Sequence, residues 1–116
     1  MTTYNDIMLE EVKKNFLSKG LPEYMWPGVK NWLKYGQIPG HFLSAVISHD
    51  LFDCINRGDQ FNQSHLKEWV WFFYNDVDGR CHGKNALETW PKHVEEVELT
   101  EIPKQFKREE GRADER

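Results

Sequence analysis

The eight residues EWVWFFYN, at positions 68–75, hold five aromatic side chains. Each large ring buries roughly 150–250 Å², so this stretch supplies much of the core that a small domain needs. Apolar residues in and just before it recur at the i, i+3, i+4, i+7 spacing of one helix face. The residues of that face are Leu66, Trp69, Val70 and Phe73. The stretch therefore predicts a central helix, mostly core, with one or two rings left for a partner; Trp71 and Phe72, at its sides, are the candidates.

Two helices are predicted at the start of the chain. Apolar residues recur at helical spacing over residues 6–19, and Gly20 ends that helix. A second stripe starts at Trp26-Pro27, where proline suits the first turn, and stops at Gly36.

The middle of the chain predicts two short helices. Pro39 is expected at the first position of one of them. Asp50 is a good N-cap for the next, which Gly58 ends. Asp53 and Arg57 stand four residues apart, a spacing that favours an ion pair on a helix surface.

After the middle helices, residues 59–63 offer several caps for the aromatic helix, and residues 76–79 predict a turn. A last short helix is expected over residues 84–90, ending at Pro91. The fold class is all-α, a compact single domain of five to six short helices. A helical domain is predicted over residues 1–93.

A charged, acidic tail is predicted over residues 94–116, partly ordered at most, with strand-like alternation confined to residues 97–102. The tail holds five basic and eight acidic residues, and the first 93 residues hold ten and eleven. A nearly neutral body with an acidic tail is a poor match for duplex nucleic acid, whose binding rests on neutralised phosphates. A small nucleotide is not excluded.

The chain shows neither a signal peptide nor an apolar run approaching the ~18 residues of a membrane span. With Cys54 and Cys81 as the two cysteines, we expect an intracellular protein with reduced thiols and no membrane partner.

Catalytic and metal-binding patterns are weak. The five histidines are scattered singly, whereas structural zinc needs four ligands, usually as close pairs. Cys54 falls among apolar residues, typical of an inert thiol. Cys81 adjoins His82, which would lower its pKa, but no third orienting group accompanies the pair. We expect no metal, no cofactor, no catalytic residues and no enzyme activity.

A set of polar residues embedded in the apolar helices forms the candidate ligand site. Its members are Gly40, His41, Asp50, Arg57, Asp59, Asn62, Tyr74 and Asn75. Helix caps and local pairs explain most of them. The alternative is a cleft with convergent polar groups over aromatic walls, in which Arg57 and the amides of Gly40 and His41 hold a phosphate. Both interpretations remain open, and the first is favoured.

Three stretches and a later tryptophan form a recognisable pattern: IPGHFLSAVISHDL, NRGDQFN and WFFYNDVDGRCHG, followed by Trp90. With them, about residues 21–90 resemble a group of small accessory proteins of tailed phages and prophages. The family pattern is PGxFLxAVLxNDL, RADxxN, YNxxPxxCWGS and a closing Trp. The matching positions are Pro39, Gly40, Phe42, Leu43, Ala45, Val46, Asp50, Leu51, Arg57, Asp59, Asn62, Tyr74, Asn75, Cys81 and Gly83. The departures are His49 for Asn, Gly58 for Ala, His82 for Trp and Lys84 for Ser.

This resemblance implies a non-enzymatic accessory factor in the cytoplasm of a bacterial host. The leading hypothesis is that it binds and neutralises a host protein, in antiviral defence, through a helical face containing Trp71 and Phe72. The acidic tail would add electrostatic complementarity or imitate nucleic acid. The alternatives are sequestration of a small nucleotide, cyclic or of ADP-ribose type, and a structural subunit that assembles as a homo-oligomer.

Overall fold

The computed structural model describes the backbone of residues 4–101 and the side chains of residues 4–97. Over this part of the chain the fold is all-α, as the sequence predicts, with seven α-helices, two 3-10 turns and no strand. The elements are α1 (Asp6–Ser18), η1 (Glu23–Met25), α2 (Trp26–Tyr35), α3 (His41–Ile47), α4 (Leu51–Arg57), α5 (Gln60–Ser64), α6 (Leu66–Asn75), η2 (Gly79–Cys81) and α7 (Ala86–Glu101). None of the helices described is both long and apolar enough to span a bilayer.

The first two helices begin and end where local signals place them. The side chain of Asn5 caps α1 by accepting a hydrogen bond from the Met8 amide at 2.8 Å. Gly20 and Gly36 follow α1 and α2 with φ of +83° and +66°, the left-handed backbone that glycine adopts without steric cost. Both predicted stops are confirmed.

In the middle of the chain, Asp50 caps α4 as predicted, since its Oδ1 accepts from the Asp53 amide at 3.1 Å. The prediction of Pro39 at the first helical position is wrong: α3 begins at His41 after Gly40, whose extended backbone leaves the proline outside. Gly58 does end α4, and a Cβ there would lie 2.8 Å from ring carbons of Phe42.

The aromatic helix is shorter than its predicted caps imply. Asp59 caps a separate five-residue helix, α5, by accepting from the Asn62 amide at 2.7 Å. The aromatic helix α6 then starts at Leu66, and His65 lies between the two. The prediction that a residue of 59–63 caps the aromatic helix is therefore wrong: Asp59 caps α5, and no side-chain cap hydrogen bond starts α6.

The last helix differs most from its prediction. α7 runs from Ala86 through Pro91 to Glu101, so the expected end at Pro91 is wrong. Trp90 and Val94, on either side of the proline, are 1% and 2% exposed, and their burial offsets the hydrogen bond that proline removes. The expected boundary between residues 93 and 94 falls inside this helix. Strand-like alternation was predicted over residues 97–102, but residues 97–101 belong to α7. Residues 102–116 lie outside the described part.

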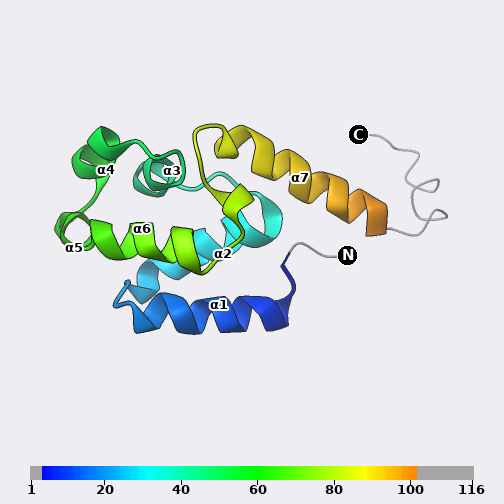
Figure 1. Ribbon diagram of the computed structural model, residues 1–116, viewed down its shortest axis with the longest axis horizontal. Helices are drawn as coiled ribbons and strands as arrows, with labels where there is room; N and C mark the ends of the chain where they lie inside the picture. The colour runs from blue at the N-terminus through cyan, green and yellow to red at the C-terminus, as the bar shows by residue number, and fades with distance from the viewer. Residues whose placement is uncertain (1–3, 102–116) are drawn as a thin grey trace.

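The core joins α1 to α6, which lie side by side in Figure 1. Phe16 of α1 is fully buried, with its ring centroid 5.6 Å from that of Trp69 and 5.3 Å from that of Phe72. Phe73 is 3% exposed, whereas Val70, predicted on the core face, is 59% exposed. Phe72 lies in the core although the helical spacing does not place it on the core face, because Phe16 of α1 packs against it.

Buried tryptophans connect distant segments through their indole N–H groups. Trp32 Nε1 donates to the Cys81 carbonyl at 2.9 Å, and Trp90 Nε1 donates to the Trp32 carbonyl at 2.9 Å. These bonds satisfy donors that burial would otherwise leave without an acceptor. They fix α2, η2 and α7 against one another.

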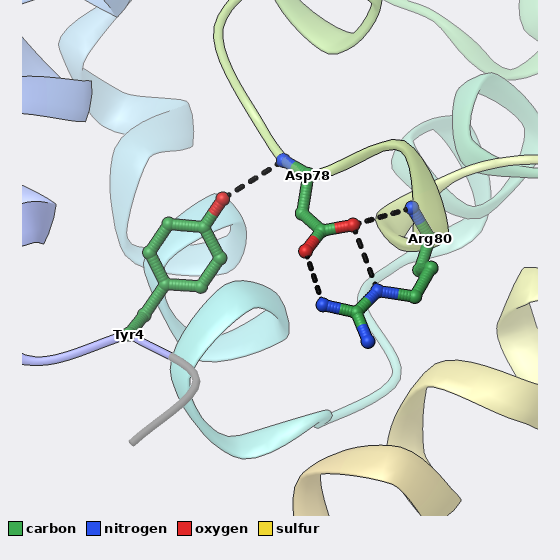
Figure 2. A network of polar contacts seen from close by, with 3 residues as sticks. All are labelled: Tyr4, Asp78 and Arg80. Atoms are coloured by element: carbon green, nitrogen blue, oxygen red, sulfur yellow. Dashed lines mark hydrogen bonds and ion pairs between the residues drawn. The ribbon is translucent and has the colours of Figure 1, made fainter. Parts of the chain in front are cut away.

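A polar network fixes the N-terminal segment to the loop after α6 (Figure 2). The Asp78 amide donates to the Tyr4 hydroxyl at 2.9 Å, and the Asp78 carboxylate receives a two-pronged contact from Arg80. Burial raises the pKa of Tyr4 to about 12. Hydrogen bonds from Arg80 hold the pKa of Asp78 below its usual value. The network connects the predicted turn at residues 76–79 to the N-terminal segment.

Candidate functional site

Residues of α3, α4 and α6, with His49 and His82 from loops, line an apolar groove of about 250 Å³. Figure 1 shows where these three helices lie in the fold. Its apolar lining consists of Val46, Leu51, Cys54, Leu66, Trp69, Val70 and Phe73. Three polar rings stand around it: His49, Tyr74 and His82. The floor is core, because Trp69 and Phe73 are almost fully buried, while Leu51 and Val70 of the walls are exposed.

Exposed apolar side chains extend this surface beyond the groove. On α4, Leu51 is 59% exposed, Phe52 81% and Ile55 48%, and on α6 Val70 is 59% exposed. Trp71, the next residue of α6, is 47% exposed, and the Lys67 ammonium lies 5.0 Å from the centre of its ring. Exposed apolar side chains on the helices that form a pocket are typical of a protein interaction site.

Of the two aromatic residues proposed for an interface, the structure leaves one accessible. Trp71 meets solvent, but Phe72 has no exposed surface and packs against Phe16 and Phe73. The assignment of Phe72 to a protein interface is therefore wrong. Helical spacing places it between the two faces of α6, and the position of α1 decides that it is buried.

A pair of histidines closes one edge of the groove. His49 Nε2 and His82 Nδ1 are 2.8 Å apart, so one ring donates a hydrogen bond to the other. His49 has a φ of +65°, and the Gly83 amide donates to the Ile47 carbonyl at 2.7 Å beside it. Burial lowers the pKa of His82, and the neighbouring His49 lowers it further. The sequence analysis did not identify this pair, although both residues are departures from the pattern that the chain resembles.

Five of the eight candidate ligand residues lie together, and the other three lie apart from them. Gly40, His41, Arg57, Asp59 and Asn62 line a second cavity, of about 400 Å³. The remaining lining residues of this second cavity are Tyr24, Met25, Gly28, Pro39, Phe42 and Leu43.

The other three candidates lie elsewhere. Tyr74 stands at the apolar groove, Asp50 caps α4, and Asn75 is the last residue of α6. The expected pair of Asp53 and Arg57 does not form: among the described residues, no ion pair or hydrogen bond joins them. Arg57 is exposed on the rim of the second cavity.

Asp59 and Asn62 organise the second cavity. The Tyr24 hydroxyl donates to Asp59 Oδ2 at 2.6 Å, and this bond, with that from the Asn62 amide, lowers the pKa of Asp59. Asn62 is 2% exposed, and its Oδ1 accepts from Trp69 Nε1 at 3.0 Å. Tyr24 was missed by the sequence analysis because it lies 35 residues from Asp59, and no local pattern joins them.

Neither cysteine has the properties of a nucleophile. Cys81 has no exposed surface, and burial raises its pKa strongly, so the expectation that His82 would lower this pKa is wrong. Burial also raises the pKa of Cys54, and the charges of Asp50 and Asp53 add to that effect. Within residues 4–97, no three histidine, cysteine or acidic side chains gather as a metal site would require.

Comparisons with protein-family models, with curated proteins and with solved structures find no significant match to this chain.

Proposed function

We propose that this protein is a non-enzymatic binding module that takes an apolar side chain of a partner protein into the apolar groove and blocks that partner by covering its surface. The observation that carries the proposal is a groove with a buried aromatic floor and exposed apolar walls. Binding energy at interfaces concentrates on a few anchors that fill such pockets and are surrounded by residues that exclude water.

The size of the groove suits one large anchor. An apolar cavity of roughly 150 Å³ holds a benzene molecule, and this groove has a volume of about 250 Å³. Phenylalanine, leucine or methionine of a partner would therefore fit. The polar rings of His49, Tyr74 and His82 form a rim that would hydrogen-bond to the partner's backbone around the anchor.

The resemblance to phage accessory proteins supplies the class of partner. We infer that the partner is a host protein, one used in defence against phage, met in the host cytoplasm. The acidic residues of the C-terminal tail would favour a partner with a basic surface. The two buried thiols, with raised pKa values, support binding over catalysis.

Site-specific photo-crosslinking in producing cells tests this proposal. A photoreactive residue at Val70, in the groove wall, should capture a host protein that mass spectrometry identifies. The same residue at Ile7, which is 82% exposed on α1, is the matched control and should not capture it. A second copy of this chain captured at Val70 would instead favour the self-assembling subunit. No adduct above the Ile7 control would overturn the proposal.

A further inference from the structure

The lining of the second cavity includes Asn62, a buried residue whose side-chain N–H group has no acceptor among the described residues. Asn62 is 2% exposed, and its Oδ1 accepts from Trp69 Nε1 at 3.0 Å. Because an indole nitrogen only donates, this bond assigns the oxygen to the Trp69 side and sets the direction of Nδ2. Among the residues described, Nδ2 has no hydrogen-bond acceptor, and it is not one of the atoms sealed from solvent. Since Asn62 lines the cavity, an acceptor for this donor would have to lie in the cavity.

A cationic donor lines the same cavity. Arg57, the last residue of α4, is exposed and makes no ion pair within the described residues. The Asp59 carboxylate, also in the lining, is already held by the Tyr24 hydroxyl and the Asn62 backbone amide. Among the described residues, no hydrogen bond or ion pair joins this carboxylate to Arg57 or to Asn62 Nδ2. His41, the first residue of α3, adds an imidazole to the lining.

The rest of the lining is apolar. Phe42 and Leu43 are 7% and 2% exposed, and Met25 packs against the core beside them. An occupant would therefore need an oxygen-rich end for the donors and a flat or apolar body for this wall. Guanidinium groups bind carboxylates and phosphates through paired hydrogen bonds, which selects an oxyanion for that end.

We propose that the second cavity binds a small organic oxyanion, a carboxylate or a phosphate ester attached to a ring. Its oxygens accept hydrogen bonds from Arg57 and from Nδ2 of Asn62, and its ring lies against Met25, Phe42 and Leu43. This site is separate from the apolar groove, with which it shares no lining residue. A failure to bind an oxyanion in this cavity would therefore leave the proposed function of the apolar groove unaffected.

The test is a titration of the ¹⁵N-labelled protein followed by NMR, with phenyl phosphate, benzoate and inorganic phosphate as the probes. Two side-chain NMR signals report on binding in this cavity: the Asn62 amide, and the Trp69 indole N–H, which donates a hydrogen bond to Asn62. We expect phenyl phosphate or benzoate to shift both NMR signals in a saturable way. The probe that binds more tightly identifies the preferred oxyanion. Inorganic phosphate, lacking the ring, should bind at least tenfold more weakly. Equal binding would overturn the role of the apolar wall.

Two matched variants complete the test. Arg57→Gln should weaken the binding of the better probe at least tenfold. Lys67→Gln removes the same charge from an exposed residue beside Trp71 and should leave binding unchanged. Because Arg57 is exposed and unpaired, its substitution leaves the core intact. Absence of shifts at Asn62 and Trp69, or an equal effect of the two variants, would overturn the proposal.

Discussion

His49 Nε2 lies 2.8 Å from His82 Nδ1, which joins the loop after α3 to the loop before α7 at the edge of the apolar groove. One hydrogen bond of this length requires that at least one ring be neutral, because two imidazolium rings would present N–H groups to each other. The pair is thus a contact that acid breaks.

The first prediction concerns pH. The folded pKa of His82 lies below its ordinary value of 6.5, so the unfolded chain binds more protons there. Stability from this residue is present above pH 6.5 and is lost as the pH falls through the lowered pKa. Urea denaturation at a series of pH values should show the free energy of unfolding decreasing on acidification below this point.

His82→Asn should flatten that dependence, and His41→Gln, on the exposed start of α3, is the control that should keep it. An unchanged slope in His82→Asn would show that the pair contributes nothing to the acid response.

The second prediction separates the two neighbouring aromatic residues of α6. Phe72→Ala removes a fully buried ring and should cost about 3–5 kcal/mol in the free energy of unfolding. Trp71→Ala removes a ring that is 47% exposed and should cost about 1 kcal/mol or less. Denaturant titration of the two variants measures both costs. Similar costs would contradict the assignment of Phe72 to the core.

The third prediction concerns the buried bond between Trp69 and Asn62. Asn62→Ala leaves the indole N–H without its acceptor and should destabilise the protein by about 1–3 kcal/mol. The Trp69 indole signal in NMR should move as the bond is lost. The control is Gln60→Ala, at the exposed start of α5, for which we expect a smaller cost. An equal or larger cost for Gln60→Ala would contradict the importance of the buried bond.

The fourth prediction concerns the contact between α2 and α7. A Cβ at Gly36 would lie 2.7 Å from the Pro91 Cα, and the φ of +66° strains any other residue. Gly36→Ala should therefore cost about 2–4 kcal/mol. Gly79→Ala, where nothing lies within 4 Å of the added carbon, should be nearly neutral. Thermal unfolding of both variants checks this, and a neutral Gly36→Ala would exclude the close approach of the two helices.

Local chemistry explains which parts of the fold the sequence predicts. Gly20 and Gly36 end helices by their own backbone freedom, and Asp50 caps α4 with its own side chain. By contrast, α7 passes through Pro91 because Trp90 and Val94 are buried against other elements. Tertiary packing, which the local pattern does not contain, decides that helix.

The candidate sites show the same division. Several of the polar residues predicted to form a ligand site do line the second cavity, Arg57 and Asn62 among them. Their partner Tyr24 comes from a distant turn, and the His49–His82 pair joins residues 33 apart, so single-sequence patterns did not reveal either. Helical spacing likewise failed to separate Phe72 from Val70, because the position of α1 decides which is buried.

The most direct test of the central claim is the affinity of the partner captured at Val70, measured by calorimetry for three forms of the protein. Val70→Glu places a charge in the exposed wall of the apolar groove, and Ile7→Glu places the same charge on an exposed apolar residue of α1. The account predicts at least tenfold weaker binding for Val70→Glu and unchanged binding for Ile7→Glu, relative to the unmodified chain. Equal affinities in all three forms would show that the groove does not hold the partner.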